Sequence, residues 1–470
     1  MTEKRTPFSA ASADELAQKL RGDVIRPGHQ EYDQARKVYN AMIDRRPGAI
    51  AYCADVADVI AAVEMARDHD ALLAIRGGGH NGAGLGICDG GLVLDLSRMR
   101  GIRVDPRTRS ARVDGGCTWG DVDHATHAFG LAAPSGIIST TGVGGLTLGG
   151  GIGNLTRMCG LTVDNLLEAD VVTADGELIT ASPDAHDDLF WALRGGGGNF
   201  GVVTSFSFNL HPVHTITGGP TFWHLDRTKE VMQWYREFIL EAPEELNGWF
   251  AFLTVPPVAP FPEELHHKKM CGILWCYAGH PADADAVFKP MRDLNPDLYG
   301  IQQMPLPGLQ SAFDGLYPPG HQWYWKADFF KELSDDVIDR HIEFAHRLPT
   351  PQSAMHLYPI NGAAHRKGRH DTAWSYREAN WGQVIVGVDP DPAKKDVLVE
   401  WARAYWEATH PYSSGGAYVN MMMDEGEDRV KASYRDNYER LARIKTMYDA
   451  DNLFRVNQNI KPAVQTTTPN

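Results

Sequence analysis

The segment RGGGHNGAG, residues 76–84, is the strongest clue to how the first half of this chain folds. It follows LLAI at 72–75, which predicts a buried strand, so the glycines begin where that strand ends. Successive glycines expose backbone N–H groups, and such a nest binds phosphate oxygens without help from side chains. The spacing alone leaves two interpretations open: a diphosphate-binding loop, or a flexible surface turn in which His80 is an ordinary loop histidine.

Two more glycine-rich segments follow. TTGVGGLTLGGGIGNLTR, residues 140–157, separates its glycines with Val, Leu and Ile, whereas flexible linkers combine glycine with serine and other polar residues. Because a flat ring can lie against backbone that carries no Cβ, we favour a ligand cradle over a linker. DDLFWALRGGGGNFGVV, residues 187–203, ends a short helix with Gly195 in a position typical of a helix C-cap, and then enters a strand.

The hydrophobic pattern changes near residue 210. Before it, short strands and helices alternate, which indicates a mixed α/β region. Beyond it, Trp-rich strands alternate with helices, which indicates an antiparallel sheet with helices on one face. The strands are expected at 248–253, 271–276 and 323–329, the helices at 227–241, 281–293 and 334–346, and a further charged amphipathic helix at 427–448.

Composition excludes several classes of protein. The 470 residues carry a formal net charge of -15, which argues against nucleic-acid binding because that depends on Lys and Arg. The N-terminus lacks the apolar stretch of a signal peptide, and no apolar run approaches the roughly 18 residues of a membrane span, so we expect a cytoplasmic protein without a membrane partner. The six cysteines form no CxxC pair, so neither a disulfide framework nor a metal site is expected. The histidines that could suggest a metal site are expected to be solvated or packed: His266, His267, His356, His365 and His370.

In this order, the glycine segments resemble the berberine-bridge-enzyme-like branch of the vanillyl-alcohol-oxidase/PCMH superfamily of FAD-linked oxidases. The resemblance also rests on RxxGLxxDN at 157–165 and on the tail between 448 and 462, and it covers nearly the whole chain. It implies an α+β fold with a PCMH-type FAD-binding domain of two α/β subdomains at 1–210. A substrate domain, an antiparallel sheet covered by helices, is then expected at 211–410, and a C-terminal return to the FAD-binding domain at 411–470.

The resemblance gives His80 a role. In that family the histidine at this position bonds to the 8α-methyl group of FAD, and the surrounding glycine loop holds the diphosphate. Many members add a second bond from a cysteine in a pattern like GxCPTxG, but here GIISTTG at 136–142 has Ile138 in that place. Cys159 stands where relatives usually carry a tyrosine and is expected to be a small packed residue. We therefore expect FAD to be linked through His80 alone, as in the 6-hydroxynicotine-oxidase type.

A last motif, AYVNMMMD at 417–424, resembles the family pattern YxNYxD, which crosses the flavin and the substrate pocket. Tyr418 and Asn420 match this pattern, and Met421 replaces the second tyrosine. A tyrosine in this region commonly takes the substrate proton, so Tyr418 is expected either to do so or to hold the cofactor. Tyr324 or Tyr376 could supply the base instead, although each also fits a half-buried sheet aromatic.

The glycine segments and the resemblance together nominate a set of cofactor-binding residues. They are Arg76, Gly77, Gly78, Gly79, His80, Asn81, Gly82, Thr141, Gly142, Gly144, Gly145, Gly149, Gly150, Gly153, Asn154, Asn165, Gly201, Val203, Tyr418, Asn420, Asn457 and Asn459.

The implied activity is that of an FAD-dependent oxidoreductase. We expect an oxidase that takes hydride from a C–H next to O or N of a small organic substrate and reduces O2 to H2O2. Two alternatives stay open: a flavin dehydrogenase with another electron acceptor, and a non-catalytic protein that binds a phosphorylated ligand. The substrate class, whether oligosaccharide, alkaloid-like amine or polyketide alcohol, stays open too, as does the choice between a monomer and a homodimer.

Overall fold

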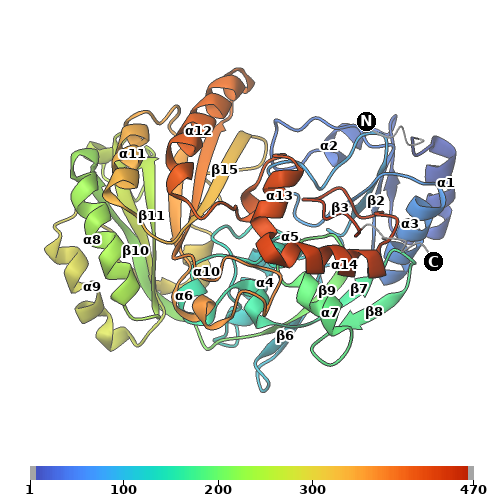
Figure 1. Ribbon diagram of the computed structural model, residues 1–470, viewed down its shortest axis with the longest axis horizontal. Helices are drawn as coiled ribbons and strands as arrows, with labels where there is room; N and C mark the ends of the chain where they lie inside the picture. The colour runs from blue at the N-terminus through green and yellow to red at the C-terminus, as the bar shows by residue number, and fades with distance from the viewer. Residues whose placement is uncertain (1–6, 464–470) are drawn as a thin grey trace, which may run out of the picture.

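The structure, a computed structural model that describes residues 7–463, contains three β-sheets. A four-stranded and a five-stranded sheet lie on the right of Figure 1, and an eight-stranded sheet lies on the left under a layer of helices. The predicted α+β fold is confirmed. Within the described residues, no helix has the length and apolar character needed to cross a membrane.

The four-stranded sheet has the order β1-β2-β4-β3, in which β2, β4 and β3 are parallel and β1 is antiparallel to β2. Its strands are β1 (Val24–Ile25), β2 (Ala49–Tyr52), β3 (Leu73–Arg76) and β4 (Leu92–Asp95), and the helices of this region are α1 (Ala10–Lys19), α2 (Tyr32–Ala35) and α3 (Val56–Asp68). Asp55 caps α3 by accepting a hydrogen bond from the backbone N–H of Asp58. The strand β3 leads directly into the first glycine segment, as the sequence predicted.

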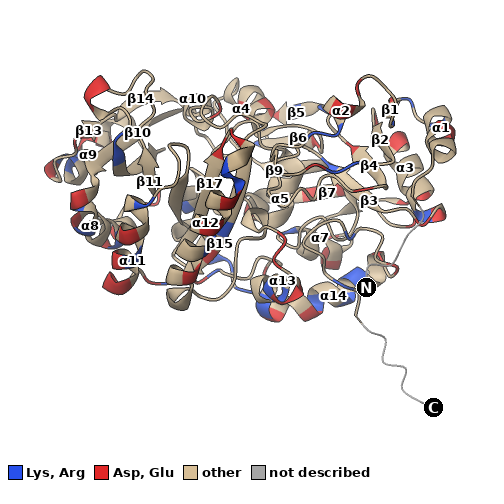
Figure 2. Cartoon of the chain, turned by 90° about the horizontal axis from the view of Figure 1, so that it is seen from above, with Lys and Arg blue, Asp and Glu red and all other residues tan. Residues whose placement is uncertain are grey.

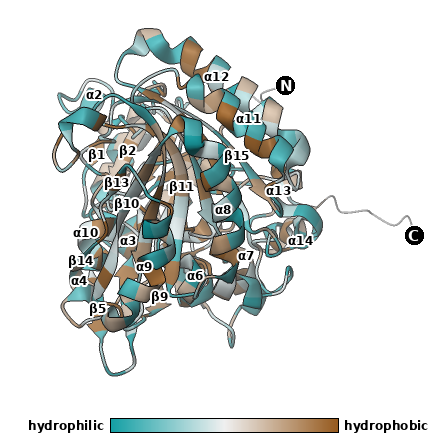
Figure 3. Cartoon of the chain, turned by 90° about the vertical axis from the view of Figure 1, so that its left-hand side faces the viewer, coloured by the Kyte–Doolittle hydropathy of each residue, from teal (hydrophilic) through white to brown (hydrophobic). Residues whose placement is uncertain are grey.

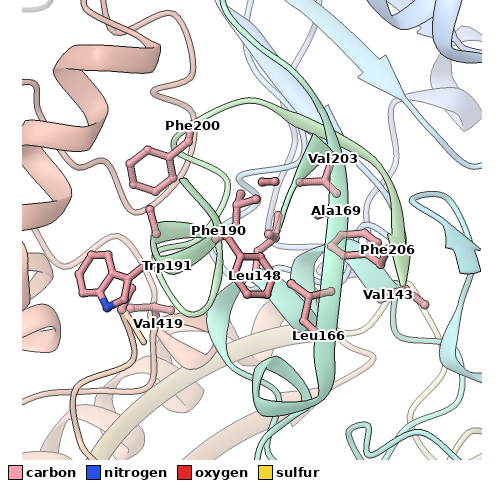
Figure 4. Packing of buried hydrophobic residues seen from close by; sticks show 14 of the residues in the cluster. Val143, Leu148, Leu166, Ala169, Phe190, Trp191, Phe200, Val203, Phe206 and Val419 are labelled. Atoms are coloured by element: carbon pink, nitrogen blue, oxygen red, sulfur yellow. The ribbon is translucent and has the colours of Figure 1, made fainter. Parts of the chain in front are cut away.

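The five-stranded sheet, with the order β5-β6-β9-β7-β8, is antiparallel throughout. Its strands are β5 (Ile102–Asp105), β6 (Ser110–Asp114), β7 (Leu166–Val172), β8 (Leu178–Ala181) and β9 (Val202–Asn209), and its helices are α4 (Trp119–His127), α5 (Val143–Gly149), α6 (Thr156–Cys159) and α7 (Asp187–Leu193). Figure 4 shows Leu148 of α5 packed among Phe190 of α7 and Phe206 of β9. The second glycine segment therefore contains a helix that its composition did not predict.

The eight-stranded sheet has the order β13-β10-β12-β11-β16-β17-β15, with β14 paired to β10, and all its pairs are antiparallel. Its strands are β10 (Thr215–His224), β11 (Leu246–Thr254), β12 (Lys269–Tyr277), β13 (Leu298–Tyr299), β14 (Gln302–Pro305), β15 (Gln322–Phe330), β16 (Ala354–Pro359) and β17 (Trp381–Asp389). The helices of this segment are α8 (Thr228–Glu241), α9 (Ala284–Asp293), α10 (Leu306–Gln310), α11 (Asp335–His346) and α12 (Lys395–Thr409).

Helices α8, α9, α11 and α12 cover one face of this sheet, and Figure 3 shows brown and teal residues on different sides of α11 and α12. Their apolar sides pack on the sheet, which is the arrangement expected of amphipathic helices. The opposite face of the sheet looks toward the other two sheets. Every described strand between residues 215 and 389 belongs to this sheet. The division of the chain into segments 1–210, 211–410 and 411–470 stays a prediction.

The C-terminal segment returns to the first half of the chain, where α13 (Glu427–Tyr434) and α14 (Tyr438–Tyr448) lie beside the five-stranded sheet. The single helix predicted over 427–448 is wrong, because the chain breaks at Arg435, which has φ of 49°. There the Arg435 side chain lies 3.9 Å from the centre of the Tyr376 ring and pairs with Glu378. These contacts to Tyr376 and Glu378 override the local helical pattern.

Two charged residues of the RxxGLxxDN motif join the domains. Asp164 forms a two-pronged ion pair with Arg377, with N···O distances of 2.8 and 2.7 Å, and both side chains are buried. Arg157 is 1% exposed and donates from Nε to Asn361 Oδ1 at 2.9 Å. Its other N–H groups donate to the backbone carbonyls of Ala242, Pro243 and Leu246. This motif therefore fixes the segment 211–410 against the first half of the chain.

Candidate active site

A cavity of about 1340 Å³ lies between the glycine segments and the uncovered face of the eight-stranded sheet. Ordinary ligand pockets measure roughly 300–1,000 Å³. This cavity is therefore large enough to take a cofactor and a substrate together.

The first two glycine segments touch each other at Gly78 and Gly142. A Cβ on Gly78 would lie 2.4 Å from the backbone nitrogen of Gly142, and a Cβ on Gly142 would lie 2.3 Å from that of Gly78. Neither glycine has a positive φ, so the close approach of two backbones, and not an unusual conformation, requires glycine at both positions. The contact brings Thr140 beside His80, which lines the cavity.

His80 is held by two neighbours. Its Nε2 lies 3.0 Å from Thr140 Oγ1, and Tyr39 stacks on the imidazole with ring centroids 4.0 Å apart. Burial lowers the pKa of His80 to about 4, so the ring is neutral at pH 7. Tyr39 lies between two short elements without regular periodicity, so the sequence offered no signal for its role.

Arg76 lies beneath the first glycine segment, where it is buried and forms an ion pair with Asp95 at the same level of the sheet. Its Nη1 is also buried and has no hydrogen-bond partner among the described residues. The Oδ1 atoms of Asn457 and Asn459 are buried in the same unpartnered way. Buried polar atoms are normally paired, so the atoms of Arg76 and Asn457, which line the cavity, fit a site that a polar molecule completes.

Two glycines leave open space at the cavity. No atom lies within 4 Å of a Cβ built on Gly145 or on Gly198, and both residues line the cavity. These bare backbone positions, together with the unpartnered donor on Arg76, fit a cofactor that has a flat ring and a diphosphate. Of these two glycines, Gly145 belongs to the segment expected to form the ligand cradle, and that cradle stays a prediction.

Most nominated cofactor-binding residues line the cavity. They are Arg76, Gly77, Gly78, Gly79, His80, Asn81, Thr141, Gly142, Gly144, Gly145, Gly201, Val203, Tyr418, Asn420 and Asn457. The nominated residues outside the lining are Gly82, Gly149, Gly150, Gly153, Asn154, Asn165 and Asn459.

Several residues outside the lining make close contacts within the protein. A Cβ on Gly149 would meet Asn420 Oδ1 at 2.1 Å, and one on Gly153 would meet the backbone oxygen of Ser135 at 1.9 Å. Asn165 donates to the backbone carbonyl of Cys159 at 2.9 Å, so its amide is used within the protein. Many glycines of the second segment are therefore required by close contacts between parts of the chain.

Tyr418 is the one candidate tyrosine of the three that lines the cavity. Its Oη accepts hydrogen bonds from the backbone N–H of Gly151 at 2.8 Å and from Asn420 Nδ2 at 2.9 Å. Burial raises the pKa of Tyr418 to about 12, and the two donors oppose that shift. The hydroxyl is thus protonated at neutral pH, and both of its lone pairs are occupied.

Tyr324 and Tyr376 lie away from the cavity. Tyr324 is in the helix-covered core, where its Oη accepts a hydrogen bond from Arg403 Nε of α12 at 2.9 Å. Tyr376 donates to the backbone carbonyl of Ala432 at 2.8 Å and stacks on Phe329 with ring centroids 4.5 Å apart. Both tyrosines pack between secondary-structure elements, so neither is part of the proposed site.

The uncovered face of the sheet supplies the other wall of the cavity. Ala354, His356 and Tyr358 alternate along β16 and line the cavity, whereas Met355 and Leu357 face the helices. Tyr358 Oη and His356 Nδ1 are 2.7 Å apart. His356, which was expected to be solvated or packed, packs against Trp249 and also lines the cavity. An alternation of this kind is visible in the sequence only once β16 is known to be a strand.

Two parts of the chain match known families. Residues 47–182 match the family described as FAD binding domain, and residues 417–461 match the one described as Berberine and berberine like. The chain is 41% identical over 470 residues to (R)-6-hydroxynicotine oxidase of Paenarthrobacter nicotinovorans, with 94% of this chain and 97% of that protein covered. It is 30% identical over 455 residues to an FAD-linked oxidoreductase of Dictyostelium discoideum, with 96% of each covered.

A solved structure has the same fold. BBE-like 1 of Physcomitrella patens superposes with a TM-score of 0.85 at 22% identity, and the match covers 96% of this chain and 99% of that chain. The three sheets and the C-terminal return are therefore an arrangement found in solved proteins.

Proposed function

We propose that this chain, which belongs to the family of FAD-linked oxidoreductases, is an oxidase of a small organic substrate. The observation that carries the proposal is the contact of the two glycine segments beside His80, on the wall of a cavity large enough for cofactor and substrate. The chemistry that FAD supplies when bound is acceptance of a hydride from a C–H next to O or N, followed by reduction of O2 to H2O2.

His80 is the proposed covalent attachment point. Its pKa of about 4 keeps the imidazole neutral, so a ring nitrogen with a free lone pair is present at pH 7. Thr140 contacts Nε2, which leaves Nδ1 as the nitrogen without a hydrogen bond to the described residues. The stacked Tyr39 ring limits rotation of the imidazole, so that nitrogen keeps one direction.

A second covalent link is not proposed. Residue 138 is isoleucine, and none of the six cysteines, all of which lie within the described residues, lines the cavity. Burial raises the pKa of Cys159 to about 12, so its thiolate is scarce at neutral pH. His80 is therefore the single anchor in this proposal.

For Tyr418 we propose the holding role. A neutral phenol whose two lone pairs already accept hydrogen bonds has no acceptor left for a substrate proton, but it keeps one O–H to donate. Tyr418→Phe should therefore weaken cofactor or substrate binding. Loss of a general base would instead lower kcat by about 10²–10⁴-fold and remove a limb of the pH profile. A pH profile of kcat for the variant separates the two roles.

The oxidase function is tested by reoxidation of the reduced enzyme in air. We expect reoxidation well above the rate of free flavin, with one H2O2 formed per substrate oxidised. Reoxidation no faster than that of free flavin would favour the dehydrogenase alternative. A purified protein without yellow colour would favour the non-catalytic alternative instead.

A further inference from the structure

The cavity wall carries almost no full charge. Among the described residues that line it, Arg76 is the one Lys, Arg, Asp or Glu, and Arg76 is paired with Asp95 beneath the first glycine segment. The substrate side therefore offers neither a carboxylate for a cation nor a Lys or Arg side chain for an anion. Figure 2 shows acidic and basic residues on outer helices such as α8, α11, α13 and α14.

A charged substrate would meet no side chain of opposite full charge on the substrate side of this cavity. Transfer of an ion from water into such a site is unfavourable unless an opposite charge or several hydrogen bonds receive it. An uncharged substrate avoids this cost. The composition of the wall therefore selects against substrates that are ions at neutral pH.

Aromatic rings form much of the substrate side. Trp323 lies between Tyr39 and Tyr317, with ring centroids 5.0 and 5.6 Å away, and Trp249 lies 5.6 Å from Phe313. All five side chains line the cavity. Offset and edge-to-face contacts with such rings favour a flat apolar molecule. A sugar, which is covered with hydroxyl groups, would place some of them against these rings, where they gain no hydrogen bond.

One hydrogen-bonded His–Tyr pair lies on this wall. His356 and Tyr358 are joined by the 2.7 Å contact between Nδ1 and Oη, and Trp249 packs on both rings at 4.8 and 5.7 Å. Burial lowers the pKa of His356 to about 4 and raises that of Tyr358, so both are neutral at pH 7. Nδ1 is engaged, so the second ring nitrogen, Nε2, stays available to a ligand.

A second hydrogen-bonded His–Tyr pair lies away from the cavity. His341 Nδ1 lies 2.7 Å from Tyr405 Oη, but this pair is buried between α11 and α12, and neither residue lines the cavity. His341 Nε2 is buried without a partner in the described chain, whereas His356 lines the cavity. Only the pair on β16 can meet a ligand in the cavity.

We propose that the substrate is an uncharged, largely aromatic alcohol that places its hydroxyl group against the His356–Tyr358 pair. This inference rests on the proposed oxidase function for the fate of that group. The carbon loses its hydrogen as hydride, the hydroxyl loses its proton, a carbonyl compound forms, and O2 is reduced to H2O2.

Calorimetric titration of the holoenzyme near pH 7 with four probes tests the substrate class. They are 2-naphthylmethanol, 2-naphthylmethylamine, 2-naphthoate and xylobiose, of which the first three share one ring system and differ in charge. We expect the alcohol to bind at least about tenfold more tightly than each of the others, a difference of about 1.4 kcal/mol. Equal or tighter binding of the amine, the acid or the sugar would overturn the proposal.

Variants test the polar pair. Tyr358→Phe should weaken binding of 2-naphthylmethanol by about two- to tenfold through the lost hydrogen bond and leave binding of 2-methylnaphthalene, which has no hydroxyl group, unchanged. Tyr405→Phe, which removes the same hydroxyl from the pair behind the sheet, should change neither. Equal weakening of both ligands by Tyr358→Phe would show that the residue only shapes the wall, and would contradict the assigned contact.

The two proposals fail in different ways. If Tyr358→Phe does not fold, the ranking of the four probes on the unaltered enzyme still decides the substrate class. If the alcohol binds most tightly but no H2O2 forms from any aromatic alcohol, the oxidase function fails and the binding preference stands. If a charged compound or a sugar is oxidised with the higher kcat/KM, the oxidase function stands and the substrate class fails.

Discussion

Gly145→Ala should have opposite effects on the stability of the protein and on its affinity for FAD. Gly145 lies within α5, and no atom lies within 4 Å of a Cβ built there. Replacing a helix glycine by alanine stabilises the folded state by about 0.5–1 kcal/mol. The same methyl projects into space that the proposal gives to FAD, where overpacking by one carbon costs about 1–3 kcal/mol. Gly145→Ala should therefore raise the stability of the flavin-free protein and lower its affinity for FAD by about five- to a hundredfold.

The affinity is measured by titrating FAD into flavin-free protein that carries His80→Ala, with and without Gly145→Ala, and following the quenching of flavin fluorescence. Gly308→Ala is the matched control, because Gly308 also lies in a helix with open space at its Cβ but does not line the cavity. The control should gain stability and keep its affinity. Unchanged affinity in Gly145→Ala would refute the assignment of this glycine to the cofactor cradle.

Three further outcomes follow from the contacts of the fold. Gly78→Ala should destabilise the protein by about 1–3 kcal/mol or more in urea unfolding, because its Cβ would meet the backbone of Gly142 at 2.4 Å; an unchanged midpoint would contradict that contact. Asp164→Asn should cost about 3–5 kcal/mol by leaving buried Arg377 without its charge partner, and a loss below 1 kcal/mol would exclude a structural role for the pair. Burial lowers the pKa of His341 to about 3, from a value near 6.5 in the unfolded chain. Between these two values the unfolded chain binds the extra proton, so the stability of the protein should fall as pH falls through this range. His341→Gln should reduce the slope of stability against pH, and an equal slope in both proteins would contradict the pKa shift.

The glycine segments could be recognised from the sequence, but the reason for many of the glycines could not. Gly78 and Gly142 are 64 positions apart, and only the folded chain shows that their backbones meet. The helix α5 was missed because glycine is a poor helix former. It is stabilised by burial of Val143 and Leu148 in the core, a tertiary effect that local propensity does not contain.

The cofactor side of the site was more predictable than the substrate side. His80 and Tyr418 lie in recognisable sequence motifs, and both line the cavity. His356 and Tyr358 have no motif, and their role depends on which face of β16 meets the cavity. The neighbouring strand β17 is buried on both faces over most of its length, so alternation of polar and apolar residues does not mark the functional face there.

The central claim, that FAD is attached through His80 alone, is tested most directly by mass spectrometry of peptides from the digested protein. We predict one flavin-bearing peptide, which contains His80 and has the mass of its sequence plus FAD. No flavin mass should occur on a peptide that contains any of the six cysteines. Flavin that is released completely on denaturation, or flavin found on a cysteine, would contradict the claim.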